Sequence, residues 1–166
     1  MDAEETFRAI DKLILKSSEI KMAAYCVSKK GISIFEKSMK TFLKNGGSLD
    51  IMLGCQTLPD VLETIKKLEK STNKSVNLSL YWRPTFHSKF YIFKLAKGGS
   101  TSIVGSSNLT WSALSENIET NIEVSNATIL EDKYNEYLKD AIRNRNEIKR
   151  KLNKVKKINE TLLFIF

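Results

Sequence analysis

The stretch that decides the fold spans residues 86–108 and consists of FHSKFYIFKLAKGGSTSIVGSSN. Its first part, residues 86–95, has the length and the aromatic and β-branched content of a strand. Gly98, Gly99 and Ser100 follow as a hairpin-type loop, and residues 101–104 form a second apolar run. The segment therefore predicts two adjacent strands that end in a turn-prone Gly-Ser-Ser-Asn sequence.

The same stretch carries the residues best suited to chemistry. It contains His87, the single histidine of the chain, and Lys89 two positions later. Side chains two apart on a strand point to the same face, so an imidazole and an ammonium are expected side by side. The second run ends at Ser106 and Asn108, which offer two hydrogen-bond donors. This set suits a phosphodiester better than a carbonyl or a metal ion.

Outward from this stretch, helical and strand patterns alternate on both sides. Before it, we expect helices at residues 4–17, 35–43 and 59–68, with strands at 20–27 and 49–55 and a half-buried strand at 76–82. After it, we expect a strand at 118–124 and one long helix from Ala127 to Val155. The pattern predicts an α/β fold, in which helices flank a mixed β-sheet on both faces.

Length and composition favour one globular domain. The chain has 166 residues, of which 42% are hydrophobic, and no apolar run approaches the roughly 18 residues of a membrane helix. The acidic start, residues 1–5, does not resemble a signal peptide, and Cys26 and Cys55 are expected to be free, buried thiols. We therefore expect a cytoplasmic protein with no membrane partner. One histidine and two separated cysteines also predict no metal site and no other cofactor.

The positive charge is concentrated near the C-terminus. The whole chain carries a net charge of +8, and residues 139–157 alone combine nine Lys and Arg with two acids. Such a segment is typical of a surface that binds polyanions, although a solvated helix face is the alternative. The nucleic-acid-binding residues expected on one helical stripe are Lys139, Arg143, Arg150, Lys154 and Lys157.

The motifs resemble those of the phospholipase D superfamily. That family's signature is His-x-Lys followed by Gly-Ser-x-Asn, here His87 to Lys89 and Gly105 to Asn108. Glu119 lies eleven residues further on, where nuclease-type members carry an acidic residue, and residues 46–54 resemble the family's turn and strand after its second helix. The resemblance covers residues 5–138. It implies a phospholipase D-like sandwich with one motif per chain, formed by a catalytic domain at 1–138. Residues 139–166 add a basic helix and an apolar tail, as part of that domain or as the start of a longer region.

The resemblance also implies a mechanism. The family reaction needs two histidines, and this chain has one, so we expect a homodimer in which two copies of His87 face each other across a two-fold axis. One copy would form a phosphohistidine, and the other would act as acid and then as base. Lys89 would neutralise phosphate oxygens, and Ser106 and Asn108 would donate hydrogen bonds to them. Glu119 would orient an imidazole, with Glu116 as its nearest competitor.

One departure from the family pattern bears on function. The family has an aspartate five residues after the lysine, and this chain has Lys94. Some metal-independent restriction nucleases of the family also lack that aspartate. We therefore expect a metal-independent nuclease, with DNA favoured over RNA and a recognition or helicase domain or chain as a further partner. The same departure keeps open a non-catalytic module that binds nucleic-acid phosphates. Phospholipase activity is less favoured, because the chain is small and has one motif. Trp111 is expected in the core rather than as a base-stacking platform.

Overall fold

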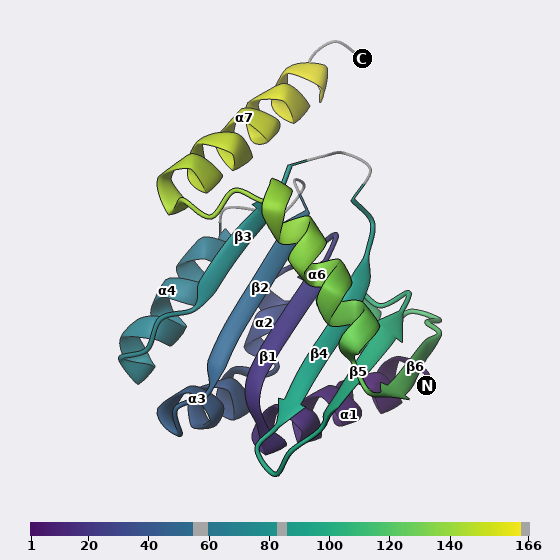
Figure 1. The fold of residues 1–166 in the computed structure, drawn as a ribbon. Helices are drawn as coiled ribbons and strands as arrows, with labels where there is room; N and C mark the ends of the chain where they lie inside the picture. The colour runs from purple at the N-terminus through teal and green to yellow at the C-terminus, as the bar shows by residue number, and fades with distance from the viewer. Residues whose placement is uncertain (55–59, 83–85, 164–166) are drawn as a thin grey trace.

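The computed structural model describes residues 1–54, 60–82 and 86–163 (Figure 1). Its helices are α1 (Ala3–Lys16), α2 (Lys29–Ser33), α3 (Glu36–Lys44), α4 (Asp60–Thr72), α5 (Trp111–Ser115), α6 (Thr128–Asp140) and α7 (Arg145–Leu163). Its strands are β1 (Ser17–Ala24), β2 (Ser48–Gly54), β3 (Asn77–Tyr81), β4 (Lys89–Leu95), β5 (Ser100–Gly105) and β6 (Asn121–Ser125). The predicted elements are present with shifted bounds, except that the single C-terminal helix is divided into α6 and α7, and the short helices α2 and α5 were not predicted. The positions of Cys55 and Pro59 lie outside the described residues.

The described strands form one mixed sheet in the order β3-β2-β1-β4-β5-β6. Strands β1, β2 and β3 are parallel, whereas β4 is antiparallel to both β1 and β5. The turn between β4 and β5 contains Gly98 and Gly99 at φ +97° and +79°, a region that disfavours side chains with a Cβ atom. The two-strand prediction for the central stretch is therefore confirmed.

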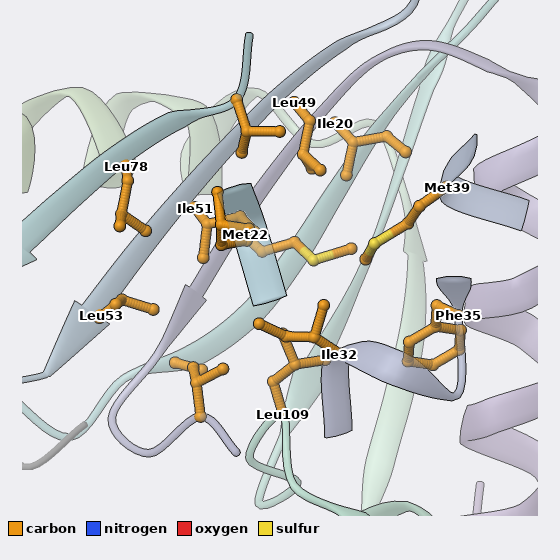
Figure 2. Packing of buried hydrophobic residues seen from close by; sticks show 14 of the residues in the cluster. Ile20, Met22, Ile32, Phe35, Met39, Leu49, Ile51, Leu53, Leu78 and Leu109 are labelled. Atoms are coloured by element: carbon orange, nitrogen blue, oxygen red, sulfur yellow. The ribbon is translucent and has the colours of Figure 1, made fainter. Parts of the chain in front are cut away.

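Helices cover both faces of the sheet, as expected for the α/β class (Figure 1). The larger core lies between the sheet and the helices α1 to α4, and Figure 2 shows side chains from β1, β2 and β3 meeting Ile32, Phe35 and Met39 there. A smaller core lies under α6 on the opposite face and contains Phe90 and Tyr134. Because Phe90 and Tyr91 point to opposite faces, β4 contributes to both cores.

Strand β3 is buried on both faces, so the prediction of a half-buried strand is wrong. Leu78 and Leu80 belong to the larger core, and Tyr81 belongs to the smaller one. Although β3 is an edge strand, the chain after α6 runs beside it, and Leu80 and Ile142 exchange two backbone hydrogen bonds of 2.8 and 2.9 Å. This contact supplies hydrogen-bond partners to backbone groups of the edge strand that would otherwise face water.

The long C-terminal helix is also a wrong prediction, because the chain leaves the helix at Ala141 to pair with β3 and starts again at Arg145. Asn144 caps the second helix: its side-chain oxygen accepts hydrogen bonds from the backbone N–H groups of Asn146 (3.0 Å) and Glu147 (3.2 Å). Asn followed three residues later by Glu is a helix-start signal, and it was present in the sequence. Ile148 and Leu152 of α7 are buried in the larger core.

Candidate active site

Three strand ends place the predicted catalytic residues at one edge of the sheet. Lys89 is the first residue of β4 and lies opposite Ala24, the last residue of β1. Gly105 ends β5 opposite Asn121, where β6 begins. Because β4 runs antiparallel to β1 and β5, the start of β4 meets the ends of both neighbours. His87, Ser106 and Glu119 therefore belong to segments that enter or leave the sheet at the same edge.

His87 and Lys89 lie side by side, as their spacing predicts, although His87 precedes the strand instead of belonging to it. The Lys89 ammonium donates to the His87 backbone oxygen (2.7 Å) and lies 3.1 Å from His87 Nδ1. An ammonium has no lone pair, so the neutral imidazole accepts at Nδ1 and carries its proton on Nε2. In this arrangement, the exposed His87 ring presents a hydrogen-bond donor at Nε2.

The Tyr25 ring packs beside both His87 and Lys89. Its ring centroid is 4.8 Å from that of His87, and the Lys89 Nζ atom lies 5.7 Å from the Tyr25 centroid. Lys89 itself is 7% exposed, and no described carboxylate lies within ion-pair distance of its ammonium. Burial lowers the pKa of Lys89, against the smaller opposing effects of Glu119 and Cys26. A phosphate would supply the negative charge that this buried cation lacks.

Glu119 bonds to Ser106 rather than to His87. Ser106 Oγ donates to Glu119 Oε2, and Asn117 Nδ2 donates to Oε1 at 3.1 Å. Among the hydrogen bonds of the described residues, none joins Glu119 to the imidazole that it was predicted to orient. Its carboxylate is still close enough to favour the charged form of Lys89. Ser106 Oγ also accepts a bond from Thr120 N–H (3.0 Å), so this hydroxyl is already used within the site.

Asn108 has a fixed amide orientation. Its Oδ1 atom accepts a hydrogen bond from the backbone N–H of Cys26 (3.0 Å), in the segment that follows β1. This bond uses the amide oxygen, and neither Nδ2 hydrogen has a partner in the described part of the chain. Asn108 can therefore donate to a phosphate oxygen, as predicted for it. Cys26 is a free, half-buried thiol, and burial raises its pKa.

Sequence reasoning missed the buried residues that hold the Gly-Ser-Ser-Asn turn in place. Ser107 and Asn121 are 0% and 1% exposed, and Asn121 Nδ2 donates to Ser107 Oγ at 2.8 Å. The Asn121 Oδ1 atom accepts from Ser107 N–H (3.2 Å), and Tyr91 OH donates to the Ser107 backbone oxygen (2.8 Å). Tyr91 lies two residues after Lys89, so the two-residue spacing could have indicated it.

Trp111 and Glu116 are placed differently from their predictions. Trp111 is 41% exposed, so its expected core position is wrong. Its indole N–H donates to Glu116 Oε1 (3.0 Å), and the Lys30 ammonium lies 5.7 Å from the ring centroid. The Glu116 carboxylate is therefore bonded to Trp111, and not to the imidazole that it was considered to orient in place of Glu119.

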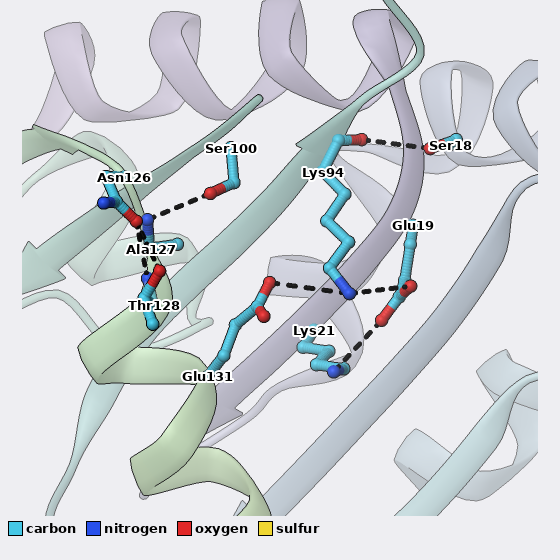
Figure 3. Close-up of polar contacts among 9 residues, drawn as sticks. All are labelled: Ser18, Glu19, Lys21, Lys94, Ser100, Asn126, Ala127, Thr128 and Glu131. Carbon is cyan, nitrogen blue, oxygen red and sulfur yellow. Dashed lines mark hydrogen bonds and ion pairs between the residues drawn. The ribbon is translucent and has the colours of Figure 1, made fainter. Parts of the chain in front are cut away.

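Lys94, at the position of the family aspartate, lies far from this site. It is five strand residues beyond Lys89, which corresponds to roughly 17 Å along β4, and it points to the α6 face. Figure 3 shows its ammonium between Glu19 of β1 (3.3 Å) and Glu131 of α6 (3.7 Å). Burial lowers the pKa of Lys94, but the two carboxylates outweigh that effect and raise it. Lys94 therefore joins the sheet to α6 through ion pairs.

The predicted nucleic-acid-binding residues do not lie on one helix. Lys139 is in the last turn of α6, Arg143 is in the connection, and Arg150, Lys154 and Lys157 are exposed on α7. The prediction of one helical stripe is therefore wrong, because the chain bends at residues 141–144.

In the described residues there is no cluster of three or more His, Cys, Asp or Glu side chains that could hold a metal ion. None of the helices in this part of the chain is long and apolar enough to cross a membrane.

Comparisons with known proteins agree with this architecture. The family model described as "Cardiolipin synthase, PLD-like domain" matches residues 10–142. The structure of a phospholipase D family member, Nuc from Salmonella typhimurium, is similar at 18% identity, with a TM-score of 0.65 and coverage of 83% of this chain and 90% of that one. NucT from Helicobacter pylori is similar at 19% identity, with a TM-score of 0.61 and coverage of 86% and 92%.

A longer protein also matches. Phosphatidylserine synthase from Haemophilus influenzae is similar at 13% identity, with a TM-score of 0.64 and coverage of 96% of this chain but only 44% of that one. Among curated proteins, no sequence matches significantly. At these identities, the structural likenesses show the fold alone.

Proposed function

Because the chain belongs to the phospholipase D superfamily, we propose that it is a nuclease, a phosphodiester hydrolase that cleaves nucleic acid without a metal ion. The observation that carries the proposal is the contact between His87 and the buried ammonium of Lys89, which has no ion pair in the described residues. A nucleophile or acid beside such a cation is suited to an anionic substrate whose charge increases in the transition state. Asn108 Nδ2 adds a neutral donor, held by the Cys26 bond.

The proposed reaction uses two copies of His87 in a homodimer. Nε2 of one copy attacks phosphorus, the bond from phosphorus to the leaving oxygen breaks, and the other copy gives its Nε2 proton to that oxygen. The second copy then removes a proton from water, the water oxygen bonds to phosphorus, and the bond from phosphorus to nitrogen breaks. The phosphodiester is thus hydrolysed, and both imidazoles regain their starting protonation.

The two copies must differ in their protonation state. The acid copy must begin as an imidazolium, because a neutral imidazole that gave up its Nε2 proton would become an imidazolate. Its Nδ1 then carries a proton and must turn away from the Lys89 ammonium that it faces in the structure. The nucleophilic copy needs a free Nε2 lone pair and therefore a proton on Nδ1. We assign Glu119 as the acceptor of that proton, because its charge already acts on Lys89. In taking this role, it would exchange its present bond with Ser106 or Asn117.

Two observations favour nucleic acid over lipid as the substrate, and a third favours catalysis over simple binding; the preference for DNA over RNA is part of the proposal. The chain covers 90% and 92% of the Nuc and NucT structures but 44% of phosphatidylserine synthase, so its length matches those of the two smaller proteins. The net charge of +8 favours polyanions. Lys94 replaces the family aspartate and was the reason to consider a non-catalytic binding module. It lies in an ion-pair network away from the site. A recognition or helicase partner and a cytoplasmic location remain part of the proposal.

The test is cleavage of plasmid and single-stranded DNA by the purified protein in EDTA. We expect cleavage to persist in the chelator, because the proposed chemistry uses imidazole groups alone. The His87→Ala variant should bind DNA and not cleave it, while a wild-type reaction stopped in alkali should retain phosphate on the protein in an acid-labile form. Loss of activity in EDTA with recovery on adding Mg²⁺ would refute the mechanism, as would cleavage by His87→Ala at the wild-type rate.

A further inference from the structure

A groove between α4 and α7 brings lysines of two helices together. It has a volume of about 250 Å³ and is lined by Leu62, Glu63 and Lys66 of α4 and by Lys149 and Asn153 of α7. None of the candidate catalytic residues lines it, and neither lysine was among the predicted nucleic-acid-binding residues. It is therefore a separate feature of the molecule.

The packing of α7 forces this juxtaposition. Arg145, at the start of α7, donates to both carboxylate oxygens of Glu69 on α4 (2.7 and 2.6 Å) and to the backbone oxygen of Val76 (2.6 Å). Further along, Ile148 and Leu152 are buried in the larger core at 0% and 2% exposure. At about 100° per residue, these contacts turn the positions after each buried residue, 149 and 153, towards α4.

Two lysines, Lys66 and Lys149, consequently line one groove, and neither has an ion pair with a described carboxylate. The proximity and charge of the Lys66 amino group lower the pKa of Lys149. Glu63 opposes the effect from the same groove, but no ion pair within 4.0 Å joins it to either lysine in the described residues. Two neighbouring ammonium groups repel, so an anion that accepts hydrogen bonds from both is favoured.

We propose that the groove formed by Lys66 and Lys149 binds a backbone phosphate of the nucleic acid, outside the site of cleavage. This inference rests on the proposed function and deepens it by assigning a second contact to the same strand. The surroundings favour a polymer over a free ion, because Arg150, Lys154 and Lys157 are exposed on the outward side of α7. On the other flank of α7, the Lys151 ammonium lies 4.8 Å from the centroid of Trp82, five residues before His87. Figure 1 shows α7 extending from the end of the sheet at which β3 terminates.

The first measurement is oligonucleotide affinity against salt, by fluorescence anisotropy, in a His87→Ala background that prevents cleavage. Lys66→Gln with Lys149→Gln is compared with Lys37→Gln with Lys44→Gln, two exposed α3 lysines, which gives a control of equal charge loss. We expect the groove pair to weaken binding about 5- to 10-fold and to lower the salt slope by about one on duplex DNA, as loss of one phosphate contact predicts. The control pair should change neither quantity by half as much. Equal effects of the two pairs would overturn the proposal.

The second measurement separates a strand phosphate from a free one. Lysine side-chain NMR of the full chain should show the Lys149 resonance shifting, and its pKa rising, on addition of the oligonucleotide. Inorganic phosphate should act at much higher concentration and be displaced by the oligonucleotide. Phosphate binding that the oligonucleotide does not displace would overturn the assignment to nucleic acid.

The cleavage assay distinguishes failure of the groove from failure of the proposed function. A wild-type protein that does not cleave, while the groove variants lose binding, would support the groove and refute the nuclease. A wild-type protein that cleaves, while the groove variants bind normally, would refute the groove alone.

Discussion

Replacing Lys94 by aspartate would restore the residue of the extended family motif, yet we expect the change to destabilise this protein. The Lys94 ammonium lies 3.3 Å from Glu19 and 3.7 Å from Glu131, so aspartate would place a third carboxylate between the two (Figure 3). The side chain of Lys94 is 40% exposed, which limits the two lost ion pairs to about 1 kcal/mol in total after solvent screening.

The new repulsion adds to this loss. A carboxylate about 6 Å from each glutamate, at an effective dielectric of about 60, contributes roughly 1 kcal/mol of repulsion per pair. The free energy of unfolding should therefore fall by about 3 kcal/mol for Lys94→Asp and by about 1 kcal/mol for Lys94→Gln. For a chain of this size, each 1 kcal/mol lowers Tm by roughly 2–4 °C.

Urea denaturation at pH 7, followed by far-UV circular dichroism, measures these differences. Lys97→Asp is the matched control, because Lys97 is exposed in the β4–β5 turn and has no ion pair in the described residues. At about 1 M salt, the gap between Lys94→Asp and Lys94→Gln should narrow, since charges are screened over roughly 3 Å. A Lys94→Asp variant as stable as the wild type, or more active in cleavage, would refute this account of the residue.

Further predictions concern α7, the turn and pH. Arg145→Gln should lower the free energy of unfolding by about 2 kcal/mol, because charge-assisted hydrogen bonds to Glu69 are lost. The variant should also show faster hydrogen exchange in α7 than in β1. Equal exchange in the two elements would show that α7 does not depend on this pair. Asn108→Asp keeps the acceptor for Cys26 N–H but replaces the Nδ2 donors, so cleavage should fall about 100-fold with stability nearly unchanged; full activity would remove Asn108 from the site. Burial raises the pKa of both Glu19 and Glu69. This effect is outweighed by Lys21 and Lys94 at Glu19, and by Arg145 and the Val76 N–H at Glu69, so both folded pKa values lie below the ordinary 4.5. The resulting stability is present above pH 4.5 and should be lost as pH falls through the folded values; urea titrations from pH 6 to 3 should show a smaller loss in Arg145→Gln, and an identical loss would contradict the assignment.

Much of the fold follows from short-range patterns in the chain. Alternating helical and strand periods, the glycines between β4 and β5, and the spacing of His87 and Lys89 predict the α/β class, the strand pair and the contact between imidazole and ammonium. These features depend on side-chain direction and turn conformation within a few residues, which the local sequence determines. Asn144 and Glu147 carried an equally local signal for the start of α7.

The tertiary structure alone decided the features that depend on distant partners. Periodicity could not show that Ile142 pairs with Leu80 and interrupts a basic helix, since that contact joins residues 62 positions apart in sequence. It could not assign Lys94 to Glu19 and Glu131, Glu119 to Ser106, or Lys149 to Lys66. Charge and hydrogen-bonding capacity are properties of single residues, but the partner that satisfies them is set by sheet register and helix packing, and therefore by contacts across the whole chain.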